Sequence, residues 1–394
     1  MHVFVKRCLL ILMLPFLSFG YCLSETNIEV KITKLVKDVK PAFPNDNVSI
    51  VFGCDDNYAM YLGVCLQSLI ETSSEKHNYD IWILEGNISE NNRRGIINLI
   101  KGRKNFSIRF FNIDDFVEKN KEKFRIFNKH LTVSTYYRLF IPQIFSNYRR
   151  MLYLDCDIII NSDISELFNV DMNGKSVGAV KDRSMCTNSR KYVKRIKGKK
   201  NGDYFNAGVM LFNIDKTARE NITDKCLEYL FSRKDGKDEF LEDQDALNAV
   251  CIDNVKLIDG RWNVLMYGYY LGMNKGSHNI INFYIVHYFS SKKPWMCSTP
   301  LDAIWWRYAA RTSFYHDILA RNRNLIIFHI IRIRVVYFLV ALLQWLHMDD
   351  LIWKTAKLRL SLIARTMEIM KDMAAFKHLK FAYKKIFFSI ICNV

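Results

Sequence analysis

The decapeptide MLYLDCDIII, residues 151–160, places two carboxylates within an otherwise apolar run. Its first half, with Arg150, has the composition of a buried strand. Side chains two residues apart on an extended chain point the same way, so Asp155 and Asp157 present two carboxylates at one point. Burying both is costly unless a cation compensates, and paired hard oxygen ligands suit Mg²⁺ or Mn²⁺. An isolated Asp-x-Asp triplet is more often a solvated strand end, so the neighbouring sequence decides its meaning.

Strand-like apolar runs and helical spacings alternate around this stretch. Apolar residues at positions 62, 65, 66 and 69, for example, recur at helical spacing between two strand-like runs. The alternation predicts βαβ units and an α/β fold with a mostly parallel sheet flanked by helices. Such sheets bind ligands at the carboxyl ends of their strands, which is where the paired carboxylates lie. Strands are predicted at residues 49–53, 79–85, 106–111, 150–154, 177–180 and 207–212, and a second helix at 93–101.

The N-terminal 24 residues carry Lys6 and Arg7 before a mostly apolar run. A signal peptide or anchor fits this pattern, but the run is short for a membrane span. A hydrophobic segment packed on the protein or on a membrane fits equally well. Residues 25–47 are interpreted as a polar linker. The ten cysteines are scattered without a CxxC pair, which argues against a disulfide framework or a zinc site and for a reduced compartment.

The net charge of +17 indicates an anionic partner. The sequence shows no nucleic-acid recognition motif, so phosphates or an acidic membrane surface are favoured over nucleic acid. Residues 301–394 hold 15 Lys and Arg against 6 Asp and Glu. Residues 302–320 are predicted to be helical, and an apolar stripe from Trp353 to Ala374 with cations beside it predicts an amphipathic basic helix. We favour contact with a membrane surface; the alternative is a helix packed on the protein.

Three further polar clusters carry possible chemistry. Residues 54–57 (CDDN) follow the first predicted strand, where a loop could bind a base and ribose. Residues 243–245 (DQD) offer two carboxylates and an amide, although an acidic helix N-terminus has the same composition. His287 is a possible imidazole ligand or a core histidine, and the Lys292–Lys293 pair could neutralise phosphate. Neither a GxGxxG motif nor a P-loop is present, which disfavours a dinucleotide or ATP site.

Six motifs stand in order along the chain: FGCDDNY at 52–58, STYYRL at 134–139, YLDCD at 153–157, FNAGV at 205–209, DQDALN at 243–248 and HYFSSKKPW at 287–295. Taken together they resemble glycosyltransferase family 8, a group of retaining enzymes that includes bacterial lipopolysaccharide glucosyl- and galactosyltransferases and the glycogenins. The resemblance covers residues 48–295, and six motifs in the family's order are far more specific than any one of them. The family usually has a glycine three residues after the histidine, where this chain has Ser290, whose side chain is expected to crowd the diphosphate.

The resemblance implies a GT-A fold, a UDP-sugar donor and a Mn²⁺ ion, with Mg²⁺ as a possible substitute. The implied metal ligands are Asp155, Asp157 and His287. Asp55 and Asn57, with the Cys54 backbone nearby, would contact the uridine, and Lys293 would reach the diphosphate. The residues implied around the donor sugar are Arg138, Asp182, Asn206, Asp243 and Gln244.

The catalytic candidates are Asp243, Gln244 and Asp245, and the resemblance implies retention of the anomeric configuration. Gln244 lies where a nucleophile is expected, but an amide is a poor one. We therefore favour attack by the acceptor from the same face, with a UDP oxygen assisting deprotonation. Asp245 as a transient nucleophile is the alternative.

The expected function is transfer of glucose or galactose from UDP-glucose or UDP-galactose to a glycan or lipid-linked glycan in lipopolysaccharide core or surface glycan synthesis. The expected location is the cytoplasmic face of the bacterial inner membrane, peripheral or held by an uncleaved N-terminal segment. The expected domains are residues 1–24, a GT-A domain at 46–298 and a helical, basic, membrane-associating C-terminal extension at 299–394.

Two other classes of protein are considered. A catalytically inactive UDP-sugar-binding scaffold is favoured by Ser290 and opposed by the intact metal-binding and lysine residues. A metal-dependent phosphotransferase or nucleotidyltransferase is opposed by the missing P-loop and kinase-type motifs.

Overall fold

The computed structural model describes residues 32–124, 133–196, 204–232, 242–266, 283–289, 292–297, 299 and 301–322. The predicted N-terminal hydrophobic segment, Ser290 and the amphipathic stretch 353–374 lie outside these ranges. Across the described residues, no helix is long and apolar enough to cross a membrane.

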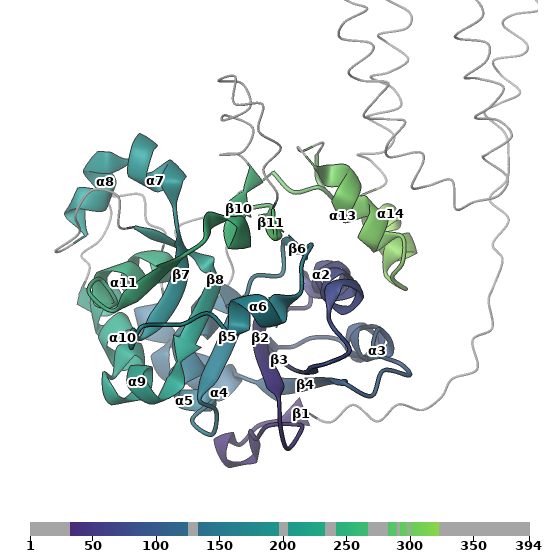
Figure 1. Cartoon of the computed structure of the whole chain (residues 1–394), viewed down its shortest axis with the longest axis horizontal. Coiled ribbons are helices and arrows are strands. Elements are labelled where there is room, and N and C mark those ends of the chain that lie inside the picture. Colours follow the sequence, from purple (N-terminus) through teal and green to yellow (C-terminus); the bar gives the residue numbers. More distant parts are fainter. Residues whose placement is uncertain are drawn as a thin grey trace, which may run out of the picture. The chain divides into compact units, whose positions relative to one another are not determined.

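An eight-stranded sheet organises the fold (Figure 1). Its spatial order is β1 (Ile32–Thr33), β4 (Phe106–Asn112), β3 (Asn78–Gly86), β2 (Asn47–Asp55), β5 (Arg150–Leu154), β8 (Phe205–Asn213), β7 (Val177–Lys181) and β9 (Val255–Ile258). Neighbours from β1 to β5 run parallel, as do β7 and β9, whereas β8 is antiparallel to both β5 and β7. All six predicted strands are present, and the predicted mostly parallel α/β sheet is confirmed.

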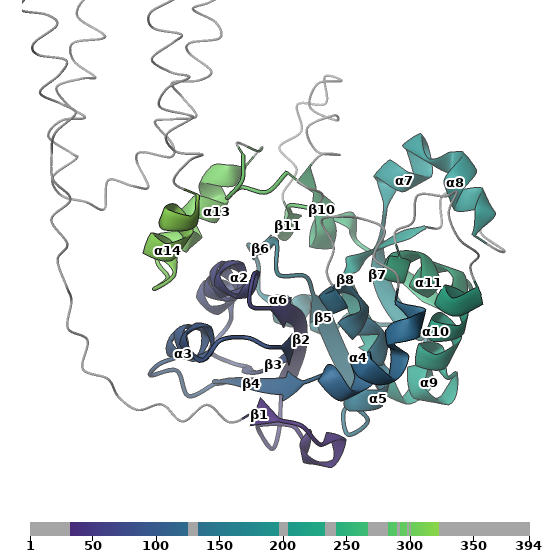
Figure 2. The ribbon, with the colours of Figure 1, turned by 180° about the vertical axis from the view of Figure 1, so that it is seen from behind.

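Strands of the sheet contain continuous apolar segments, so both faces of the sheet must be covered by helices. Residues 50–52 of β2 are fully buried, as expected for a parallel strand with helices on either side. Figure 1 shows α6 (Ile164–Phe168) in front of the sheet, and the opposite view in Figure 2 shows α4 (Asp114–Asn120) and α5 (Ile141–Ile144) in front. The other helices of this part are α2 (Ala59–Thr72), α3 (Glu90–Asn98), α7 (Arg183–Asn188), α8 (Arg190–Arg195), α9 (Ile214–Arg219), α10 (Ile222–Ser232) and α11 (Glu242–Val250).

Two of these helices were predicted from the sequence. In α2 the apolar positions 62, 65, 66 and 69 are all fully buried, so the predicted helical spacing is confirmed. Helix α3 begins three residues before the predicted start at position 93. The reason is Ser89, whose side chain accepts a hydrogen bond from the Asn92 amide and caps the helix.

The prediction that residues 25–47 form only a linker is wrong for the described part. Strand β1 pairs in parallel with β4, with Ile32 opposite Phe110. Further along, the Ala42 amide donates to the Asp80 carboxylate at 3.0 Å. A two-residue strand has no periodicity to detect, so the sheet extends beyond the predicted edge without a sequence signal.

A second sheet has three strands, and two of them come from the part of the chain after β9. Its order is β10 (Val264–Leu265), β11 (Ile285–His287) and β6 (Ile158–Ile160). Strands β6 and β11 are antiparallel, with His287 opposite Ile158. This pairing brings a histidine from late in the chain next to the residues that follow β5.

Helices α13 (Asp302–Ala309) and α14 (Tyr315–Arg321) replace the single helical stretch predicted at 302–320. Phe314 directly precedes α14, and its ring lies against α2 and α3, because a β-carbon at Gly63 or Gly95 would lie 2.4 or 2.5 Å from ring atoms. Arg311 also pairs with Glu71 of α2 at 2.7 Å. Residues 301–322 therefore pack on the α/β domain.

We expect Phe314→Ala to lower the free energy of unfolding by about 3–5 kcal/mol, because the lost ring leaves a cavity between glycines that cannot fill it. Urea unfolding of the full chain measures this change. Phe231→Ala is the matched control: that ring is 61% exposed, and its loss should cost about 0.5 kcal/mol or less. Equal effects of the two substitutions would contradict the packing role of Phe314.

Candidate metal and donor-binding site

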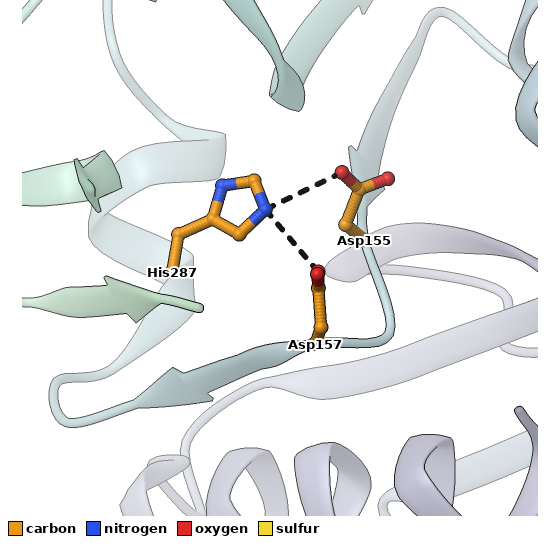
Figure 3. Close-up of side chains that lie close together, drawn as sticks. All are labelled: Asp155, Asp157 and His287. Atoms are coloured by element: carbon orange, nitrogen blue, oxygen red, sulfur yellow. Dashed lines mark ion pairs between the residues drawn. The ribbon is translucent and has the colours of Figure 1, made fainter. Parts of the chain in front are cut away.

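The three predicted metal ligands converge at one point (Figure 3). Asp155 and Asp157 follow β5, and His287 ends β11. The His287 Nε2 atom lies 3.5 Å from Asp155 Oδ2 and 3.2 Å from Asp157 Oδ1. One potential ligand atom from each residue lies within 4.8 Å of the others. Two carboxylate oxygens and one imidazole nitrogen form a ligand set suited to a divalent cation such as Mn²⁺.

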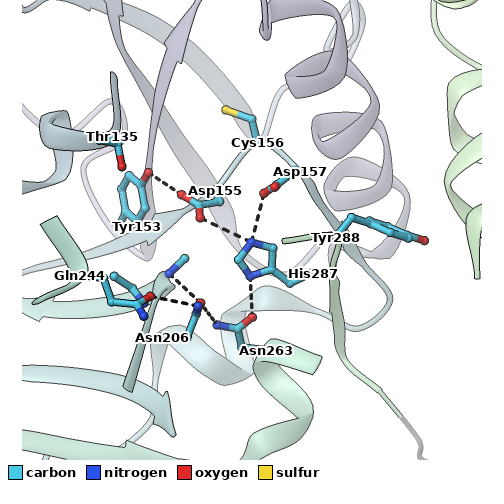
Figure 4. A network of polar contacts seen from close by, with 12 residues as sticks. Thr135, Tyr153, Asp155, Cys156, Asp157, Asn206, Gln244, Asn263, His287 and Tyr288 are labelled. Carbon is cyan, nitrogen blue, oxygen red and sulfur yellow. Dashed lines mark hydrogen bonds and ion pairs between the residues drawn. The ribbon is translucent and has the colours of Figure 1, made fainter. Parts of the chain in front are cut away.

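A chain of amides fixes which nitrogen of His287 faces the carboxylates (Figure 4). Asn206 Oδ1 accepts from the Gly208 backbone amide at 3.0 Å and from Asn263 Nδ2 at 2.7 Å. The Asn263 oxygen then faces His287 Nδ1 at 2.9 Å, so Nδ1 is the donor of this pair. In the neutral ring, Nε2 therefore offers its lone pair towards the carboxylates, the orientation that a metal ligand needs.

Two cations compensate the paired carboxylates. Arg138 contacts Asp155 Oδ1 at 2.9 Å, and the Tyr153 hydroxyl donates to the same oxygen at 2.7 Å. Lys293 forms an ion pair with Asp157. Burial alone would raise the pKa of Asp157, but the neighbouring charge of Lys293 outweighs burial and holds this pKa below its usual range. Asp157 is therefore an anion at neutral pH.

Arg138 links the metal-ligand cluster to α11. Its Nε atom lies 2.9 Å from Asp243 Oδ2, and Thr135 donates to the other oxygen of Asp243 at 2.8 Å. Arg138 and Thr135 both belong to the 3₁₀ helix η3 (Val133–Phe140). Burial raises the pKa of Asp243, whereas Arg138 and Thr135 act in the opposite direction. The Arg138 guanidinium thus connects Asp155, a predicted metal ligand, with Asp243, which is predicted to lie near the donor sugar.

Gln244 and Asp245 have different surroundings although they are neighbours in the chain. Gln244 Oε1 accepts from Asn206 Nδ2 at 3.1 Å and from the Ala207 amide at 3.0 Å. The fully buried Asp245 accepts hydrogen bonds from the Tyr204 hydroxyl at 2.6 Å and from Tyr192. Gln244 therefore joins the amide chain of the site, and Asp245 is held by two phenols.

Asp182 lies at the N-terminus of α7. Its carboxylate accepts from the Met185 amide at 3.0 Å and caps that helix. Burial raises the pKa of Asp182, an effect opposed by that hydrogen bond and by Asn206. The cap thus places a buried carboxyl group beside the amide chain of the site.

The predicted nucleotide residues lie where β2 ends. Phe52 of β2 pairs with Leu154 of β5, so the residues that follow both strands leave the sheet at the same edge. Asp55 Oδ1 accepts from the Tyr58 amide at 3.1 Å. Cys54 is buried and Asn57 is exposed, which places one at the base of this loop and the other at its surface.

The two candidate phosphate lysines differ in their environment. Lys293 is buried, and besides its ion pair with Asp157 it donates to the Tyr288 carbonyl at 2.9 Å. Lys292 is exposed. Only Lys293 is thus directed at the metal-ligand cluster.

Sequence reasoning missed Asn263, which orients His287, and Tyr204 and Tyr192, which hold Asp245. A lone asparagine in a polar segment carries no signal of its own. It also missed the spatial role of Gly208. A β-carbon there would lie 2.3 Å from His287 Cε1 and 2.6 Å from Asp155 Oδ2. The glycine of the FNAGV motif therefore provides the space in which imidazole and carboxylate meet.

We expect Gly208→Ala to abolish Mn²⁺ binding while the protein stays folded, because the added methyl group displaces His287 or Asp155. Titration calorimetry with MnCl₂ measures the binding, and circular dichroism checks the fold. Gly260→Ala is the control, since a β-carbon at Gly260 meets nothing within 4 Å. Wild-type affinity in Gly208→Ala would exclude this cluster as the metal site.

Residues 49–298 match the family model of glycosyl transferase family 8. General stress protein A of Bacillus subtilis is 28% identical over 265 residues, which cover 64% of this chain and 90% of that protein. The lipopolysaccharide 1,2-glucosyltransferase of Escherichia coli K12 is 26% identical over 258 residues, covering 63% of this chain and 72% of that protein.

Solved structures show the same relationship. The galactosyltransferase LgtC, solved in complex with donor and acceptor sugar analogues, has a TM-score of 0.58 at 27% identity and covers 68% of this chain and 96% of its own. The bifunctional glycosyltransferase WbbM has a TM-score of 0.61 at 27% identity, covering 72% of this chain and 53% of its own. The mostly parallel sheet flanked by helices is that of GT-A-type proteins such as LgtC. The family model spans more than half of the sequence, and this chain belongs to glycosyltransferase family 8.

Proposed function

We propose that this protein is a retaining, Mn²⁺-dependent hexosyltransferase that moves glucose or galactose from a UDP-sugar to a glycan hydroxyl. The observation that carries the proposal is the convergence of Asp155, Asp157 and His287 Nε2 in a family 8 glycosyltransferase. The residues present fit the ion: Gly208 leaves space, and the amide chain directs Nε2. Mn²⁺ suits this ligand set, Mg²⁺ is the alternative, and the bound ion would offset charge on the departing diphosphate.

The donor would lie along the edge where β2 and β5 end. Asp55 and Asn57, at the end of β2, would contact the uridine, with the Cys54 backbone beside them. Lys293 would offset phosphate charge from a buried position, where a fixed cation acts more strongly than in water. Its neighbour Lys292 is exposed and has no such advantage.

The donor sugar would lie against the residues connected by Arg138 and the amide chain. These polar groups are already fixed by one another, so they could receive sugar hydroxyls without reorganisation. The proposed contacts are Arg138, Asp182, Asn206, Asp243 and Gln244.

Retention by same-face attack is favoured over a covalent intermediate. The Gln244 oxygen accepts two hydrogen bonds, which lowers the reactivity of an already poor nucleophile. Asp245 is fully buried and held by two tyrosine hydroxyls. LgtC, according to one of its structures, has an active-site glutamine that was replaced by glutamate, which supports a place for Gln244 beside the reacting atoms.

The acceptor is proposed to be a glycan or lipid-linked glycan in lipopolysaccharide core or surface glycan synthesis. The named activity of the Escherichia coli relative supports this class. We further propose that the enzyme works at the cytoplasmic face of a bacterial inner membrane, with the basic residues after position 322 meeting anionic headgroups.

The function is tested by screening UDP-sugars for release of UDP with and without Mn²⁺. We expect hydrolysis of UDP-glucose or UDP-galactose that requires the ion and is lost in Asp157→Asn, which keeps the side-chain shape but removes a charged ligand. UDP binding without turnover of any sugar would support the inactive scaffold. Release of pyrophosphate would support a nucleotidyltransferase.

The diphosphate contact is tested by comparing the two lysines. We expect Lys293→Ala to weaken UDP binding in the presence of Mn²⁺ by roughly 1–3 kcal/mol, the range for one charge-assisted contact. Lys292→Ala, the matched control, should leave the affinity near that of the wild type. Calorimetry measures both, and a loss found only in Lys292→Ala would reverse the assignment.

A further inference from the structure

The C-terminal helices reach the nucleotide loop. Arg321, the last residue of α14, donates to the Asn57 carbonyl at 3.2 Å and to Asn57 Oδ1 at 3.1 Å. The Tyr61 hydroxyl, in the first turn of α2, faces Arg321 and Asn322. Because the family model ends at residue 298, this contact comes from a part of the chain that the family match does not include.

The contact decides which way the Asn57 amide points. A guanidinium has only hydrogen-bond donors, so the atom of Asn57 that faces it must be the oxygen. Turning the amide over would set its NH₂ group against the donors of Arg321. The Asn57 Nδ2 group is therefore presented away from Arg321 as a donor, whereas an unrestrained surface asparagine could present either group.

The helix that carries Arg321 is firmly attached. Trp305 of α13 is fully buried, with its ring 5.1 Å from that of Trp295. The Tyr288 hydroxyl donates to the Leu301 carbonyl at 2.6 Å, and Phe314 packs on the glycines of α2 and α3. An arginine at the end of such a helix pair has a defined position even though its side chain is exposed.

We propose that Arg321 is a positioning residue for base recognition, which holds the Asn57 amide so that its NH₂ group donates to the carbonyl oxygen at position 4 of uracil. The inference rests on the proposed function, in which Asn57 meets the uridine. Cytosine carries an amino group at position 4, and two donors would then face each other. The C-terminal helices would thus help the site to distinguish uridine from cytidine nucleotides.

The test is calorimetry of UDP and CDP, each with Mn²⁺, on full-length wild type, Arg321→Ala, Arg321→Lys and Arg311→Ala. We expect Arg321→Ala to weaken UDP binding about threefold to tenfold, the range for one hydrogen bond, with little loss for CDP. The preference for UDP should fall by the same factor. Lysine also only donates, so Arg321→Lys should restore part of the preference.

Arg311→Ala is the control on the same helix pair, because its partner Glu71 lies at the far end of α2. It should keep the wild-type preference, and unfolding midpoints verify that all variants fold. An unchanged preference in Arg321→Ala, whether both affinities fall or neither does, overturns the inference and leaves the proposed function standing. A wild-type protein that binds neither nucleotide overturns the proposed function, and the inference with it.

Discussion

The placement of two neighbouring carboxylates, one buried and one partly buried, is the constraint on which the rest of this site depends. Asp155 and Asp157 lie at the end of a buried strand, where an uncompensated charge would be strongly unfavourable. The compensating cations come from separate parts of the chain: Arg138 from η3, and Lys293 from the segment after β11. The pairing of β6 with β11 is therefore an electrostatic requirement as well as a packing arrangement.

Local rules were sufficient for much of the fold. The apolar runs of β2, β3 and β5 and the spacing of α2 identify an α/β sheet, because each pattern is complete within one element. The same holds for Asp155 and Asp157, whose common direction follows from the pleat of a single strand. Their position at a carboxyl-terminal sheet edge follows from the topology class.

The features that could not be predicted depend on pairing over long distances. Nothing in the sequence of residues 205–213 predicts that β8 lies antiparallel between β5 and β7. Asn263 orients His287 through an amide chain that begins at Gly208, and none of its links is visible in the local sequence. The aromatic and basic residues of α13 and α14 are compatible with a membrane surface. Their packing on the domain depends on Gly63 of α2 and Gly95 of α3, which leave space for the Phe314 ring and lie far from it in the sequence.

The charge balance of the site links the metal to the nucleotide. The carboxylates of Asp155, Asp157 and Asp243 face two cationic side chains, Arg138 and Lys293, so these five groups together have an excess of negative charge. A diphosphate would be repelled by this cluster, and Lys293 could turn to a phosphate only by leaving Asp157 unpaired. A divalent cation removes both obstacles, since it neutralises the carboxylates and frees the lysine. Each ligand should therefore bind more tightly when the other is present, because the coupling of two binding equilibria is reciprocal.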